Sequence, residues 1–99
     1  MSEATAALAR EMVAVCASLF ARGYSYGSAG NVSARTDDTV LATPTNSSLG
    51  ALEAAALAHL SLDGTPRNAA KPTKEINFHL GIYRAVPEAR AIVHLHSTY

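Results

Sequence analysis

Two histidines separated by one residue, His94 and His96, are the sharpest chemical feature of the sequence. In a strand, side chains at positions i and i+2 leave the same face, so both imidazoles can converge on one ion while Leu95 points to the opposite face. Neutral imidazole is a common ligand of zinc. The alternative is a pair of strand histidines with separate hydrogen bonds, and two ligands alone do not close a metal site.

Glu75 and His79 form a second candidate pair, because residues four apart share one face of a helix. Glu75 falls in the first turn of a predicted helix, where the helix dipole favours a carboxylate. It is therefore either a capping group or a general acid/base beside the metal. His79 lies next to an apolar stripe, which favours a packing role over metal ligation.

Three loops carry groups that bind anions: Gly30–Asn31, Thr45–Asn46–Ser47 and Thr73–Lys74. Backbone amides at a glycine turn, hydroxyls and a helix N-terminus with a lysine are the parts of a phosphate site. Small polar residues are also ordinary in turns. A phosphate site is therefore indicated only if the three loops converge.

The first elements that would position these residues are a helix and a hairpin. Apolar residues at three- and four-residue steps predict a helix over residues 3–22, with Ser2 as a cap and an end at Gly23, after which Tyr24 packs back on the last turn. The stripe consists of Leu8, Met12, Val15, Cys16 and Leu19. Residues 31–35 and 39–42, joined by a turn, read as a β-hairpin.

The second part of the sequence predicts two more helices and two more strands. An alanine-rich stretch over residues 52–58 reads as a short helix, and residues 59–62 as a strand ending at Asp63–Gly64. Thr73 is the predicted N-cap of a helix that runs to Ala85, with Ile76, Leu80 and Tyr83 buried. Residues 91–96 read as a strand. This order indicates an α/β domain with helices packed on a mixed sheet.

Composition excludes several classes of protein. The 99 residues are 48% hydrophobic and 16% charged, with eight basic and eight acidic side chains, which fits one domain and argues against disorder. Zero net charge and scattered basic residues argue against nucleic acid as a partner. Charges near the start and the absence of a long uninterrupted apolar run argue against a signal peptide and a membrane span, so we expect a cytoplasmic protein. The single cysteine, Cys16, is expected to be a buried thiol.

Taken in order, four motifs resemble the class II aldolase/adducin family, and within it the 3-oxo-tetronate 4-phosphate decarboxylases. Next most similar are the L-fuculose-phosphate and L-ribulose-phosphate types of aldolase. The motifs keep both order and spacing over nearly the whole chain. They lie at residues 29–35, 43–50, 71–75 with His79, and 87–97.

The resemblance implies a three-layer α/β/α fold with a mixed, largely antiparallel sheet, of which residues 1–99 are the N-terminal part of a single domain. It also implies a homotetramer with one Zn²⁺ per subunit. His94 and His96 match two zinc ligands, and Glu75 matches the catalytic acid/base, which can also touch the metal. The third histidine ligand is absent from this chain. The residues that match the substrate-phosphate loops are Gly30, Asn31, Thr45, Asn46, Thr73 and Lys74.

The implied activity is a carbon–carbon lyase reaction: decarboxylation of a 3-oxo-tetronate 4-phosphate to dihydroxyacetone phosphate and CO₂. Zinc would act as a Lewis acid that stabilises an enediolate, which Glu75 protonates. The alternatives are a class II sugar-phosphate aldolase and a non-catalytic adducin-like module, against which the presence of Glu75, His94 and His96 argues. For the 99-residue chain alone, we expect weak metal binding and little or no activity.

Overall fold

The structure, a computed structural model, describes residues 2–96. Its strands form a four-stranded sheet in the order β3-β2-β1-β4, and every strand pair is antiparallel within the described residues. The prediction of a largely antiparallel sheet is therefore confirmed for the strands of this chain. The elements are α1 Glu3–Ala21, β1 Asn31–Arg35, β2 Val40–Ala42, η1 Leu49–Ala51, η2 Ala54–Ala56, β3 Ala58–Leu60, α2 Ile76–Ala85 and β4 Ala91–His94.

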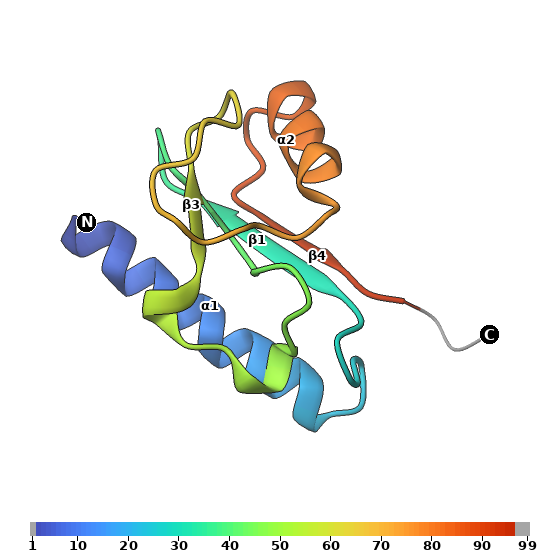
Figure 1. The fold of residues 1–99 in the computed structure, drawn as a ribbon. Helices are drawn as coiled ribbons and strands as arrows, with labels where there is room; N and C mark the ends of the chain where they lie inside the picture. Colours follow the sequence, from blue (N-terminus) through green and yellow to red (C-terminus); the bar gives the residue numbers. More distant parts are fainter. Residues whose placement is uncertain (1, 97–99) are drawn as a thin grey trace.

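The two helices cover opposite faces of the sheet, as Figure 1 shows. Alternation along the strands explains this, because successive side chains point to opposite faces. Val32 and Leu41 pack with Met12 of α1 in one core cluster. Val40 packs with Leu80 and Tyr83 of α2 in another cluster. The arrangement is the three-layer α/β/α architecture that the resemblance implied.

Helix α1 begins at Glu3, as the sequence predicts, and ends at Ala21, one residue before the predicted end. The hydroxyl of Ser2 accepts a hydrogen bond from the backbone N–H of Thr5 at 3.1 Å. At the other end Gly23 takes a left-handed φ of +80°, and the N–H of Tyr24 donates to the carbonyl of Leu19 at 3.0 Å. The N–H of Gly23 also donates to the carbonyl of Phe20 at 3.1 Å, and the two hydrogen bonds together form a Schellman motif. The side chains of Val15 and Tyr24, however, are exposed, so their predicted packing is wrong.

The predicted short helix over residues 52–58 is also wrong. Within this segment there is one 3₁₀ turn, η2; the other turn, η1, ends just before the segment, and strand β3 already begins at Ala58. Leu49 and Leu57 are both buried in the α1-side core, and this packing outweighs the helix propensity of a few alanines, since so short a helix is marginal. Strand β3 ends at Leu60 because Ser61 donates its N–H to the carbonyl of Thr65 in a turn.

Helix α2 begins at Ile76, later than predicted. The N–H of Ile76 donates to the carbonyl of Thr73 at 3.1 Å, so residues 73–76 form a tighter turn before the helix. Glu75, not Thr73, is the N-cap residue. The hydroxyl of Thr73 still accepts the N–H of Glu75 at 3.3 Å, which is why the sequence pattern resembled a cap. Strand β4 ends at His94, so His96 follows the strand instead of lying in it.

By length and composition alone, α1 is long and apolar enough to cross a membrane. Its sequence has no long uninterrupted apolar run, because Arg10 and Glu11 interrupt it, but its alanines keep the mean hydropathy high. In the structure Ala9, Met12 and Cys16 of this helix are buried against the sheet and the η1 region. α1 therefore buries one face against the rest of the domain, as an amphipathic helix does, and leaves its other face accessible.

Candidate active site

Glu75, His94 and His96 come together at the amino end of α2. Each contributes one ligand atom, and the three atoms lie within 4.8 Å of one another. His94 is the last residue of β4, and the imidazoles of His94 and His96 lie with their ring centroids 5.1 Å apart. The two rings therefore share one side of the chain, as their spacing predicts, although the strand ends between them.

The donor set fits a zinc ion. Two imidazole nitrogens and a carboxylate oxygen are ligands that zinc takes in proteins. The Nδ1 atom of His94 is buried and has no hydrogen-bond partner within residues 2–96. A buried polar atom without a partner is costly unless a ligand satisfies it. Glu75 and His96 are accessible, so an ion could reach the group from solvent.

A small hollow of about 140 Å³ opens beside this group. The three loops with anion-binding groups converge on it, together with Glu75 and His96. All six residues matched to the substrate-phosphate loops line it: Gly30, Asn31, Thr45, Asn46, Thr73 and Lys74. The structure thus places the predicted phosphate loops and the predicted metal group at one site.

The backbone holds the loops around the hollow in unusual conformations. Gly30 has a φ of +84°, and a Cβ there would lie 3.4 Å from the carbonyl oxygen of His94. Asn46, which is not a glycine, has a positive φ of +59°, a conformation that asparagine tolerates. The second and third loops are joined, because the N–H of Thr45 donates to the carbonyl of Lys71 at 2.9 Å. The shape of the hollow therefore depends on the backbone conformation of the loops as well as on their side chains.

Glu75 is left free for chemistry by the way α2 begins. It occupies the N-cap position, but its carboxylate makes no capping hydrogen bond. The capping explanation of Glu75 is therefore wrong. The carboxylate instead faces the hollow and the metal group. A carboxylate that lines a pocket beside metal ligands has the placement that a general acid/base needs.

His79 lies under the site, not in it. It is fully buried, and its ring nitrogens contact the hydroxyl of Ser33 at 2.6 Å and the amide oxygen of Asn31. Burial lowers the pKa of His79 first, the neighbouring His94 lowers it further, and Glu75 raises it. Its interactions are those of the satisfied packing residue that the sequence favoured.

Sequence reasoning missed two residues that line the hollow, Ser28 and Pro44, and noted Ser47 without assigning it a role. Ser28 lies two residues before Gly30, and a hydroxyl so close to a glycine turn was the available signal. Pro44 forms a bridge with Pro72 that holds two of the loops together. The Ser47 hydroxyl donates to the carbonyl of Pro44 at 2.7 Å, so it stabilises its own loop.

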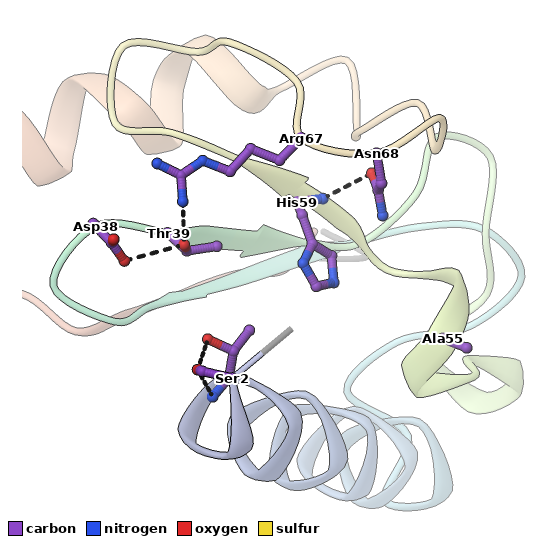
Figure 2. Close-up of a pocket in the computed structure, with 8 residues that line it drawn as sticks. Ser2, Asp38, Thr39, Ala55, His59, Arg67 and Asn68 are labelled. Carbon is purple, nitrogen blue, oxygen red and sulfur yellow. Dashed lines mark hydrogen bonds between the residues drawn. The ribbon is translucent and has the colours of Figure 1, made fainter.

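A larger hollow, about 560 Å³, lies elsewhere, near the amino end of α1 (Figure 2). Its polar groups are engaged with one another: Arg67 donates to the hydroxyl of Thr39 at 2.7 Å, and Asn68 accepts the N–H of His59 at 3.1 Å. Among the described residues it contains neither the grouped metal ligands nor the loops with anion-binding groups. Size therefore does not identify the site here, whereas the chemistry of the smaller hollow does.

The fold and this constellation define a class of protein, one with the class II aldolase fold. Residues 10–99 match the family described as "Class II Aldolase and Adducin N-terminal domain", and the chain belongs to that family.

Two named relatives within the family are similar to this chain over most of its length. The chain is 59% identical over 90 residues to a 3-oxo-tetronate 4-phosphate decarboxylase of Pectobacterium atrosepticum, covering 90% of this chain and 41% of the relative. It is 42% identical over 90 residues to an L-fuculose phosphate aldolase of Methanococcus vannielii, covering 91% of this chain and 49% of the relative.

A solved structure agrees with the fold. It is YgbL of Klebsiella pneumoniae, described as a putative aldolase/epimerase/decarboxylase, with a TM-score of 0.90 and 48% identity. The match covers 96% of this chain and 46% of that one. The chain thus spans less than half the length of these relatives.

Proposed function

We propose that this chain supplies the phosphate pocket, the acid/base and two zinc ligands of a decarboxylase that acts on a 3-oxo-tetronate 4-phosphate. The products would be dihydroxyacetone phosphate and CO₂. The observation that carries the proposal is that Glu75, His94 and His96 group beside the hollow lined by the three loops. The decarboxylase name of the relative from Pectobacterium atrosepticum supports the choice of reaction.

The hollow would bind the phosphate end of the substrate. The loops at Gly30, Thr45 and Thr73 line it, and so does the exposed Lys74, so their hydroxyls and backbone amides and the lysine ammonium group would bind the anion. The amino end of α2 adds a favourable dipole for an anion. Binding at this remote end holds the reacting carbons against the metal group, so binding energy is used for orientation.

Glu75 would carry the proton of the reaction. When CO₂ leaves, the carbon–carbon bond breaks and its electron pair stays on the substrate. A bound zinc ion, held by His94, His96 and a third histidine from outside residues 1–99, would supply Lewis-acid stabilisation of that charge. Glu75 takes up a proton from water and delivers it from its carboxyl oxygen to the substrate carbon, in place of the CO₂ that leaves. Its position at the edge of both the hollow and the metal group supports this role.

Two other functions use the same residues differently. A class II aldolase would break the bond to an aldehyde carbon instead of a carboxylate, and the similarity to an L-fuculose phosphate aldolase favours it as the second candidate. A non-catalytic adducin-like module would need none of the three ionisable groups. We further propose a cytoplasmic homotetramer, in which the rest of the site comes from outside this chain.

The test is an assay of the native polypeptide that carries this sequence. It is offered a 3-oxo-tetronate 4-phosphate and, separately, L-fuculose 1-phosphate, and the release of CO₂ and of aldehyde is measured. We expect CO₂ and dihydroxyacetone phosphate in equal amounts, lost with a chelator and restored by zinc. Aldehyde release without CO₂ would establish the aldolase instead. Full activity in metal-free protein or in Glu75→Ala would overturn the proposed mechanism.

A further inference from the structure

A chain of buried polar side chains runs from Tyr83 in the last turn of α2 to Asn31, which lines the phosphate hollow. Its members are Tyr83, Ser33, His79 and Asn31, each no more than 5% exposed. The hydroxyl oxygen of Ser33 lies 2.8 Å from the hydroxyl of Tyr83 and 2.6 Å from Nδ1 of His79. Nε2 of His79 contacts Oδ1 of Asn31. Buried polar groups of this kind are rarely left without partners, so the directions of these bonds matter.

With the amide oxygen of Asn31 toward His79, as the structure has it, the donors and acceptors of this chain have one consistent assignment. The amide oxygen of Asn31 can only accept, so Nε2 of His79 must carry the proton and donate. His79 is fully buried and its hydrogen-bonding partners are neutral, which disfavours the charged ring, so Nδ1 is an acceptor. Ser33 therefore donates its proton to Nδ1, and Tyr83 donates to Ser33.

The same geometry leaves the nitrogen of the Asn31 amide on the side of the hollow. Its oxygen is held inward by His79, while Asn31 itself lines the hollow. Within the described residues the amide nitrogen has no partner, and it is not among the buried unsatisfied atoms. The nitrogen is therefore the end that reaches the hollow. A donor there attracts an anion, whereas an amide turned by 180° would present its oxygen and repel one.

We infer that His79 is a positioning residue, whose Nε2–H tautomer fixes the Asn31 amide so that its nitrogen donates to the phosphate of the substrate. The inference rests on the proposed function of the hollow. Ser33 fixes the tautomer directly, and Tyr83 acts one step further back. A residue that ordinary sequence reasoning assigns to packing thereby acts on substrate binding, without touching the substrate or the metal group.

The first measurement is the protonation of the His79 ring in the native polypeptide. With ¹⁵N-labelled histidine, NMR distinguishes a protonated ring nitrogen from an unprotonated one. The sequence has four histidines, and the His79 signals are those lost in His79→Gln. We expect a neutral ring with the proton on Nε2 at neutral pH. A proton on Nδ1, or on both nitrogens, would overturn the inference.

The second measurement separates substrate binding from turnover in four variants. Ser33→Ala removes the donor to Nδ1 and His79→Leu removes the donor to Asn31, so both should raise KM about tenfold or more with a smaller change in kcat. His79→Gln keeps an amide donor and should recover much of the loss. Tyr24→Phe is the matched control, because the Tyr24 side chain is exposed and lies outside this network. Equal KM values in wild type, Ser33→Ala and His79→Leu would overturn the inference.

Failure of the proposed function would be visible separately. Wild type that neither binds inorganic phosphate nor turns over phosphorylated substrate would contradict the phosphate site itself. The position of the proton in the same sample would still decide the assignment of His79, since it requires no activity. Ser33→Ala removes one oxygen from a buried site, so its folding is checked by thermal unfolding before the kinetics.

Discussion

The two faces of the sheet are built from the same strands but differ in kind. Along β1, Val32 and Ala34 enter the dry core beneath α1, whereas Asn31 and Ser33 enter a polar network with α2. The α1 face contains apolar side chains that need only to exclude water. On the α2 face each buried polar group needs a specific partner, and that network ends at the candidate site. The comparison teaches that one strand with a period of two can serve stability on one face and chemistry on the other.

The largest effect is expected on the α2 face, from the loss of the acid/base. Glu75→Gln keeps the size of the side chain but removes the proton that it delivers, so kcat should fall by about 10²- to 10⁴-fold. The thermal unfolding temperature should stay unchanged, because the carboxylate makes no capping bond. Glu88→Gln, an exposed carboxylate after α2, is the control and should retain full activity. A Glu75→Gln enzyme as active as the control would remove Glu75 from the mechanism.

The next effect is expected on the α1 face and should concern stability alone. Leu41 is fully buried in the α1-side core, so Leu41→Ala should cost about 2–5 kcal/mol of unfolding free energy. Activity per folded molecule should be retained. Val15→Ala, on the exposed side of α1, should cost far less. Chemical denaturation measures both. Similar losses in the two variants would contradict the assignment of the α1 face as the core.

A smaller effect is expected at the edge of the hollow. Lys74→Met removes an ammonium group next to the phosphate loops and should raise KM by about tenfold, because a charge-assisted hydrogen bond is lost. Lys71→Met is the matched control, since the side chain of Lys71 does not line the hollow. Steady-state kinetics at low salt compares the two. Equal KM values would remove Lys74 from phosphate binding.

The smallest effect is expected for the reactivity of Cys16, which tests how apolar the α1-side core is. Burial in the α1-side core raises the pKa of the Cys16 thiol to about 11. The folded protein should therefore react very slowly with iodoacetamide at pH 8. Because the unfolded thiol ionises nearer pH 9.0, the contribution of Cys16 to stability is complete below that pH and is lost as the pH rises toward 11. Rapid alkylation of the folded protein at pH 8 would contradict the burial.

Much of this arrangement could be predicted from residue types and spacing. The start and end of α1, the hairpin and the shared side of His94 and His96 follow from local rules: capping, glycine at a left-handed position, and alternation. The alanine-rich segment before β3 could not be predicted in this way, because the burial of Leu49 and Leu57 decided its conformation. Tertiary packing overrides propensity where a segment is short.

The candidate site also has features that the sequence predicts and features that depend on tertiary structure. Its residue types were visible in the sequence, and resemblance to a family supplied their order. The role of His79 was not visible, because its partners Asn31 and Ser33 lie more than forty residues away along the chain. The free carboxylate of Glu75 was not visible either, since it depends on the tight turn at Thr73 that delays the start of α2.

The most direct test of the central claim is the zinc content of the native polypeptide after dialysis, measured by atomic emission for wild type, His94→Ala and His59→Ala. His59 is the matched control, because it lies in β3 and lines the other hollow. The account predicts one zinc per subunit in wild type and in His59→Ala, and loss of zinc in His94→Ala. Zinc retained in full by His94→Ala would contradict it.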